Sequence, residues 1–265
     1  MLAAVRNNGL ALEDASDKLK ADKEVVLAAV RNNGYALQFA SVERKTDKEV
    51  VLAAVRKNWF ALVYTSAERK TDKEVVLAAV RQNGNALRYA SVERKADKEV
   101  VLAAVQQTGW ALEYASAELQ ADKEAVLAAV QQNGLVLACA ELKADKEVVL
   151  AAVQQNGWAL RYASVERKAD KEVVLVAVQH GECALQFVAS KNLQIDTGFV
   201  LGVCRMLAGK KIQNYPTVHS WIRQLPSFQG KLALSLFTDA TSSLDNLMED
   251  ETNRHMTMLE SFSLR

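Results

Sequence analysis

The residues of this 265-residue sequence that could perform chemistry are few and scattered. Three histidines and three cysteines carry side chains that commonly serve as metal ligands, nucleophiles or general bases: His180, His219, His255, Cys139, Cys183 and Cys204. No HExxH pattern, Cys/His metal-ligand spacing or cluster of carboxylates accompanies the histidines. His219 and Ser220 are adjacent, but neighbouring residues on a helix point about 100° apart, and no acidic residue is placed to orient the histidine. The sequence therefore predicts no catalytic site, no metal site and no cofactor.

Two further patterns point away from phosphate chemistry and from secretion. Gly209–Lys210–Lys211 lacks the preceding glycine and the following Ser or Thr of a phosphate-binding P-loop. Three cysteines without a CxxC pair cannot form a complete disulfide set, which is typical of reduced thiols inside the cell. The N-terminus has no signal-peptide pattern, and no apolar run approaches the ~20 residues of a membrane span. We expect an intracellular, cytoplasmic protein that does not insert into membranes.

Net charge argues against a polyanionic partner. Lys and Arg number 33 against 32 Asp and Glu. Since no overall positive field attracts phosphates, we do not expect nucleic acid or an acidic membrane as the main partner.

The dominant feature of the chain is a repeated 25-residue segment, seen in Asp22 to Thr46 as DKEVVLAAVRNNGYALQFASVERKT. The DKE signature occurs seven times, starting at Asp22, Asp47, Asp72, Asp97, Asp122, Asp145 and Asp170. A carboxylate pair for catalysis would not be copied in this way, so these residues are expected to cap helices and carry surface charge. Self-similarity at this period indicates a repeat architecture, in which each unit buries its core against its neighbours.

The unit itself reads as a helix-turn-helix. Asp22 is a preferred N-cap and Glu24 favours the first helical turn, while Thr before Asp in two units allows a capping box that would start the helix one residue earlier. The apolar run Val25 to Val30 predicts a helix sandwiched on every side, with a buried strand as the weaker alternative. Asn33–Gly34 is expected to end the helix in a left-handed conformation. A second, shorter helix over 35–41 and a polar return segment complete the unit.

The ends of the array differ from its middle. Met1 takes the position of Val26, so we expect the chain to be a fragment of a longer array, the alternative being a short first unit. The sequence predicts an all-α fold, with an α-solenoid over residues 1–205 and a non-repeat, partly helical C-terminal cap or tail over residues 206–265. Pro216 and Pro226 bracket a short helix, and residues 231–237 and 243–262 are further candidates.

Two rows of residues vary between units and are the candidates for binding a partner. The position after the turn glycine holds Leu10, Tyr35, Phe60, Asn85, Trp110, Leu135, Trp158 and Cys183. These residues either fill gaps between units or form a row of anchors, and we select Tyr35, Phe60, Trp110 and Trp158 as candidates.

The second row follows the last valine of the first helix. It holds Arg6, Arg31, Arg56 and Arg81, and then Gln106, Gln131, Gln154 and Gln179. Arg31, Arg56 and Arg81 are candidates. Together with the ERK triplets at 43–45, 68–70 and 93–95 they could make a local basic face, although glutamates in the same triplets favour a solvated surface.

The recurring DKEVVLAAVxxNGxALxYASxExKxD resembles the tandem-repeat family catalogued as domain of unknown function 4116, over residues 1–205. Two of the 25-residue units make one copy of that domain. The resemblance implies a repeat architecture and brings no known activity or catalytic residues.

Three functions are compatible with this sequence. The first is a non-enzymatic scaffold that binds another protein or a peptide along a repeated face. The second is the recognition arm of a larger enzyme or effector whose catalytic part lies outside this chain. The third and weaker one is RNA binding along the arginine row, which would need excess positive charge and stacking aromatics on the same face.

Overall fold

The computed structural model describes residues 1–188, 193, 196–209 and 216–225. These residues form helices and no strand, so the predicted all-α fold is confirmed and the strand alternative is wrong for the part described. The candidate elements at 231–237 and 243–262, and His255, lie outside the described residues. The chain forms two compact units, residues 1–155 and residues 156–265, and the boundary between them falls within the repeat array.

Each repeat contributes one long α-helix, one 3-10 helix and, in most repeats, one short α-helix. In the first unit the long helices are α1 (Leu2–Asn7), α3 (Lys23–Asn32), α5 (Lys48–Lys57), α7 (Lys73–Val80), α9 (Lys98–Gln107), α11 (Lys123–Gln132) and α12 (Lys146–Gln155). The 3-10 helices are η1 (Gly9–Asp14), η2 (Gly34–Phe39), η3 (Trp59–Tyr64), η4 (Gly84–Tyr89), η5 (Gly109–Tyr114) and η6 (Gly134–Ala138). The short helices are α2 (Asp17–Lys20), α4 (Val42–Thr46), α6 (Ala67–Thr71), α8 (Val92–Lys95) and α10 (Ala117–Gln120).

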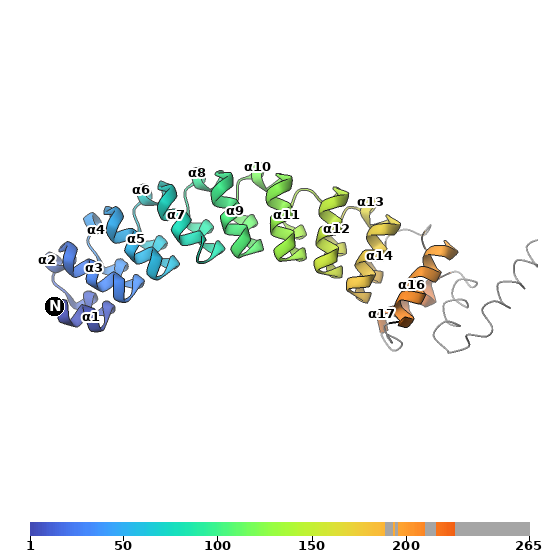
Figure 1. The fold of residues 1–265 in the computed structure, drawn as a ribbon, viewed down its shortest axis with the longest axis horizontal. Coiled ribbons are helices and arrows are strands. Elements are labelled where there is room, and N and C mark those ends of the chain that lie inside the picture. Colours follow the sequence, from blue (N-terminus) through green and yellow to red (C-terminus); the bar gives the residue numbers. More distant parts are fainter. Residues whose placement is uncertain (189–192, 194–195, 210–215, 226–265) are drawn as a thin grey trace, which may run out of the picture. The chain divides into compact units, whose positions relative to one another are not determined.

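Within this unit the long helices lie side by side, each packed on the next, and the short helices follow one edge (Figure 1). Each 3-10 helix packs against the long helix before it and the long helix after it, and against the neighbouring 3-10 helices. This arrangement is an α-solenoid, as the sequence predicts. Long helices and 3-10 helices form two layers, and the core lies between them.

The long helices begin where the sequence predicts. The Asp47 side chain accepts the backbone amides of Glu49 (3.0 Å) and Val50 (3.4 Å), which places it at the N-cap of α5. Thr46 belongs to the preceding short helix, where its hydroxyl donates to the Glu43 carbonyl (2.7 Å). The capping-box alternative, with a start one residue earlier, is therefore wrong.

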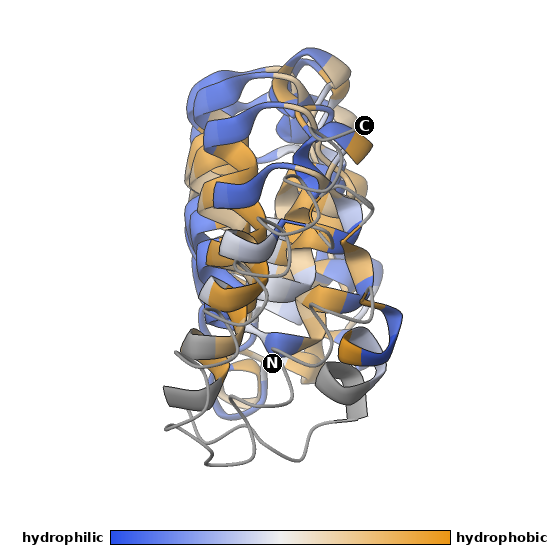
Figure 2. Ribbon diagram, turned by 90° about the vertical axis from the view of Figure 1, so that its right-hand side faces the viewer, coloured by the Kyte–Doolittle hydropathy of each residue, from blue (hydrophilic) through white to orange (hydrophobic). Residues whose placement is uncertain are grey.

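The long helices are not sandwiched on every side. In α3, Val25, Val26, Ala29 and Val30 are buried, whereas Leu27 and Ala28 are half-buried. The same pattern recurs in the other long helices, so a strip of leucine and alanine remains accessible on the solvent side of this layer. Figure 2 shows hydrophobic and hydrophilic residues on the same helices.

The predicted second, shorter helix is present, whereas the expectations of a return segment without a helix and of a left-handed turn at Asn33–Gly34 are wrong. Residues 34–39 form a 3-10 helix, and the expected polar return segment contains a short α-helix capped by Ser41, whose hydroxyl oxygen accepts the Arg44 amide (3.3 Å). Asn33 has φ −141° and ψ 114°, which is extended backbone, and its side chain caps the 3-10 helix by accepting the Tyr35 amide (3.0 Å).

Glycine is needed at position 34 for close packing between repeats. A Cβ on Gly34 would stand 2.5 Å from the Ala54 carbonyl oxygen on the next long helix and 2.9 Å from the Cβ of Asn58, the residue after that helix. Gly9, Gly84 and Gly109 meet the next helix in the same way. No side chain fits at this distance without moving a neighbour.

Trp59 stands where most other repeats have this glycine. Asn58 takes extended backbone, φ −152°, as Asn33 does in its repeat. The following helix, α7, ends two residues earlier than α3 or α5, and its last turn tightens as the Gln82 amide donates to the Ala79 carbonyl (3.1 Å). We attribute the tightened turn to Trp59, since Ala79 corresponds to Ala54, which faces Gly34.

A set of backbone hydrogen bonds ties successive repeats together along the short-helix edge. The Ser41 amide donates to the Lys20 carbonyl (2.9 Å), and the same backbone bond recurs from Ser66, Ser91 and Ser116.

After η6 the repeat is two residues shorter, and residues 140–145 form turns where the earlier repeats have a short helix. The two-residue deletion thus coincides with the loss of the short helix.

The second unit contains η7 (Gly157–Tyr162), α13 (Val165–Lys168), α14 (Lys171–His180), η8 (Glu182–Phe187), α16 (Thr197–Gly209) and α17 (Pro216–Gln224). Helix α16 takes the place of the next long helix, since Asp196 caps it by accepting the Phe199 amide (2.8 Å). It continues past Arg205, where the sequence places the end of the repeats. Helix α17 is the helix expected between the prolines, and it packs against η8 with Trp221 and Ile222 buried.

Candidate functional site: two rows of variable residues

The residue after the glycine is the second residue of each 3-10 helix. A 3-10 helix has three residues per turn, so Gly34 and Leu37 share a buried side while Tyr35 and Gln38 share another side. Large side chains in this row remain exposed: Leu10 to 37%, Tyr35 to 38%, Trp110 to 39% and, in the second unit, Trp158 to 44%. Tyr35, Trp110 and Trp158 therefore present aromatic surface that the core does not use.

Phe60 differs from the other candidates because it is half-buried at the centre of an aromatic cluster. Its ring lies 5.8 Å from Tyr35, 5.4 Å from Trp59, 6.1 Å from Tyr64 and 5.6 Å from Tyr89, measured between ring centroids. These residues come from three successive 3-10 helices. At Phe60, therefore, the interpretation that the row fills gaps between repeats fits best. In the second unit, the Trp158 ring similarly lies 5.6 Å from the Phe187 ring, measured between centroids.

The arginine row lies in the last turns of the long helices, on the solvent side of that layer. The Arg31 and Arg56 side chains are each 66% exposed and make long ion pairs, Arg31 with Glu49 at 4.0 Å and Arg56 with Glu74 at 3.6 Å. Exposed pairs of this length contribute little to stability, so both guanidinium groups are available to another anion.

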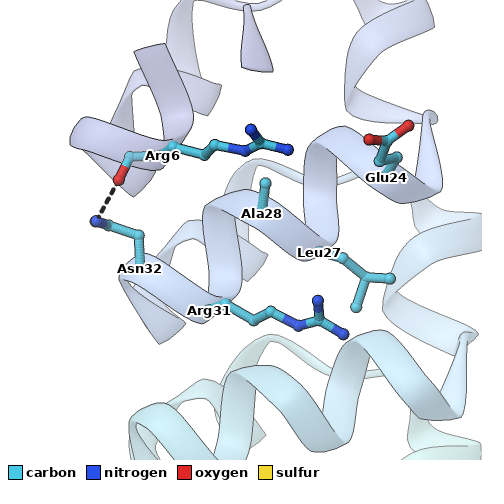
Figure 3. Close-up of a pocket in the computed structure, with 6 residues that line it drawn as sticks. All are labelled: Arg6, Glu24, Leu27, Ala28, Arg31 and Asn32. Carbon is cyan, nitrogen blue, oxygen red and sulfur yellow. Dashed lines mark hydrogen bonds between the residues drawn. The ribbon is translucent and has the colours of Figure 1, made fainter. Parts of the chain in front are cut away.

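Two open grooves lie between neighbouring long helices and bring arginines together in pairs. The first, between α1 and α3, is lined by Arg6, Glu24, Leu27, Ala28, Arg31 and Asn32 (Figure 3). The second, between α5 and α7, is lined by Arg56, Lys73, Glu74, Leu77, Ala78 and Arg81, with Glu99 at its side. No residue of the aromatic row lines either groove, so the two candidate rows form separate surfaces.

Sequence reasoning missed the floor of these grooves. The sequence predicts that Leu27, Ala28 and their counterparts are buried, because a run of six apolar residues does not indicate which of them stay accessible. It also missed Asn32, whose side-chain amide donates to the Arg6 carbonyl (2.9 Å) while its oxygen accepts the Gly9 amide (2.8 Å), fixing α3 against α1.

The arginines of the ERK triplets do not form a basic face. The Arg44 side chain is only 13% exposed and donates from Nη1 to Asp47 (3.1 Å). Asp47 also accepts Lys23 Nζ from the preceding repeat (3.1 Å), and Lys23 reaches Glu49 as well (2.8 Å).

This ladder of ion pairs recurs along the first unit, from Lys48, Lys73, Lys98 and Lys123 to the Asp and Glu of the next DKE signature. It accounts for the repeated carboxylates, which also cap helices as expected. For the pKa of Asp47, desolvation by burial is the largest influence and raises it, but the Lys23 bond and the Val50 and Glu49 amides together bring it below the usual range.

Among the described side chains, no three His, Cys, Asp or Glu residues gather closely enough to hold a metal ion. Burial raises the pKa of the Cys204 thiol to about 12, so it is not an activated nucleophile. Cys139, half-buried, also has a raised pKa, chiefly through burial. Over the ranges the structure describes, every helix is too short or too polar to cross a bilayer.

Comparison with known families gives one result. The model of the domain of unknown function DUF4116 matches four times in tandem, at residues 1–45, 47–95, 97–143 and 139–168. The chain belongs to this family. The first three matches each cover two of the 25-residue repeats, as the resemblance implies, and α14 and η8 continue the same structural pattern beyond the last match. No curated protein and no solved structure matches the chain.

Proposed function

We propose that the repeat array is a non-enzymatic scaffold that binds another protein or a peptide along a repeated face. The observation that carries this proposal is the exposure of Tyr35, Trp110 and Trp158 at equivalent positions of the repeat. Aromatic side chains of this kind are the usual anchors of protein interfaces, because they bury a large area at a small cost in conformational entropy. Tyr35 and Trp110 are the second residues of η2 and η5 in the first unit, and Trp158 is the second residue of η7 in the second unit.

An intracellular location belongs to the same proposal. It is supported by three free cysteines, since secreted proteins ordinarily pair theirs.

The experiment uses the intact chain as bait and then measures binding of each purified partner directly. Replacing Tyr35, Trp110 and Trp158 with alanine should leave the helical circular-dichroism signal intact and weaken the interaction by at least ~2 kcal/mol if one of them is a hot spot. Phe60→Ala is the matched comparison, because its ring fills the aromatic cluster and its removal should lower stability. Unfolding of the Trp110→Ala variant would assign that residue to the core and overturn the proposal.

A further inference from the structure

The two grooves of the long-helix layer share one composition, although they lie two repeats apart. Each has a floor of half-buried leucine and alanine, Leu27 and Ala28 in one and Leu77 and Ala78 in the other. Each is flanked by one arginine from either helix. In Figure 3 the Arg6 and Arg31 side chains extend in the same direction along this floor.

Positive charge exceeds negative charge in both grooves. Arg6 and Arg31 face Glu24 in the first, and Arg56, Lys73 and Arg81 face Glu74 and Glu99 in the second. Lys73 is held by Glu99 (2.8 Å) and Arg56 by Glu74 (3.6 Å). The guanidinium groups of Arg6 and Arg81 have no partner among the described residues, so each groove retains one unpaired cation beside an apolar floor.

We propose that helices α1 to α7 bind an extended acidic peptide across this layer, with a carboxylate at every third residue and small or aliphatic side chains between. Packed helices lie about 8–10 Å apart, and three residues of extended chain advance about 10 Å. One acidic side chain per helix then meets each of Arg6, Arg31, Arg56 and Arg81. The intervening side chains rest on the leucine and alanine floor, and about ten residues span the four arginines.

The chain itself limits this surface to its first four repeats. From α9 onward the arginine is replaced by glutamine, at Gln106, Gln131 and Gln154 in the first unit, while the glutamates remain at Glu124 and Glu147. A peptide carboxylate bound at these later helices would lie near a glutamate and would have no arginine to pair with. The inference concerns a different surface from the aromatic row, and it stands or fails independently of that row.

An RNA strand fits these grooves less well. Its phosphates follow one another at every nucleotide and would pass Glu24, Glu74 and Glu99, whereas a peptide with spaced carboxylates leaves gaps for them. RNA binding also draws on stacking aromatics, and none lines either groove.

The test measures fluorescence anisotropy of a labelled ten-residue peptide with glutamate at every third position and alanine or leucine between, added to the full chain. Binding should weaken as salt rises from about 50 to about 500 mM, because the contacts are exposed ion pairs. The Arg6→Gln/Arg81→Gln double variant should weaken binding at least about four-fold, given that an exposed pair typically contributes up to about five-fold. The later repeats already carry glutamine at the equivalent position, as Gln106 and Gln131, so the substitution is compatible with the fold.

A gain-of-function variant and three controls complete the design. Gln106→Arg should tighten binding of a thirteen-residue peptide carrying one more glutamate, and leave the ten-residue peptide unchanged. Trp110→Ala should leave peptide binding intact, which separates this result from the aromatic row. Absence of peptide binding, equal binding of a peptide with clustered glutamates, or tighter binding of a uridine-rich RNA oligonucleotide would each overturn the proposal.

Discussion

At the residue scale, one position of the repeat accepts both a charged and an apolar side chain. Arg44, Arg69 and Arg94 occupy it in the middle repeats, and Leu119 occupies it in α10, where it is buried to 7% exposure. The arginines are 13–22% exposed and pair with the aspartate that caps the next long helix, but their buried Nε atoms have no hydrogen-bond partner. Burial of the alkyl stem thus provides much of the stability that arginine contributes at this position.

A substitution taken from the chain itself separates these contributions. We expect Arg69→Leu to keep the free energy of unfolding within about 1 kcal/mol of the parent, because Leu119 shows that leucine packs at this position and Asp72 keeps its ion pair with Lys48 (3.0 Å). Arg69→Ala should cost about 1–3 kcal/mol, since the stem is lost and not replaced. Urea denaturation compares the variants. A Leu variant destabilised as much as the Ala variant would show that the ion pair with Asp72 dominates.

At the scale of elements, the sequence predicts the long helix well and the rest of the repeat poorly. Asp22 and its counterparts signal the helix start through their own side chains, and the apolar run gives the type of element. The 3-10 conformation of Gly34–Phe39 is set by the next repeat, which lies against Gly34, so no local pattern reports it. The short helices have four or five residues, fewer than a periodic pattern needs.

The candidate rows were found because they vary between repeats against a constant background. The surroundings of these rows are not predictable from the sequence, because the floor of the grooves and the ladder of ion pairs depend on contacts between residues about 25 positions apart. Lys98, for example, reaches Asp122 (2.8 Å) and Glu124 (2.9 Å) on the next helix.

This ladder makes the stacking of helices dependent on pH. The Lys98 bond, followed by the Ala125 amide, lowers the pKa of Asp122 below its usual range. A carboxyl whose folded-state pKa is depressed contributes stability that is complete above its unfolded pKa, near 3.9, and is lost as pH falls through the folded value. We therefore expect the urea midpoint to fall between about pH 5 and pH 2. In a Lys48→Met/Lys73→Met/Lys98→Met variant, the urea midpoint should fall less over the same pH range. An unchanged pH dependence would show that these lysines do not cause it.

At the scale of the whole molecule, stability is a sum over neighbours. Each long helix packs on the next, so opening at one place exposes only the adjoining interfaces. In the second unit α17 packs on η8 and buries Trp221 to 3% exposure, which gives the non-repeat segment a structural role at this place. Such an arrangement allows parts of the chain to open independently.

Cysteine reactivity tests this independence, because the thiols lie in different compact units. Cys204 is fully buried with a pKa of about 12, so alkylation there requires local opening, whereas Cys139 in the first unit is partly exposed. Removing a buried tryptophan typically costs about 3–5 kcal/mol, so Trp221→Ala should speed alkylation of Cys204 at least about ten-fold and leave Cys139 unchanged. Mass spectrometry after timed exposure to iodoacetamide follows each site, with Trp110→Ala as the surface control. Equal acceleration at Cys139 and Cys204 would instead show that the repeats open as one cooperative body.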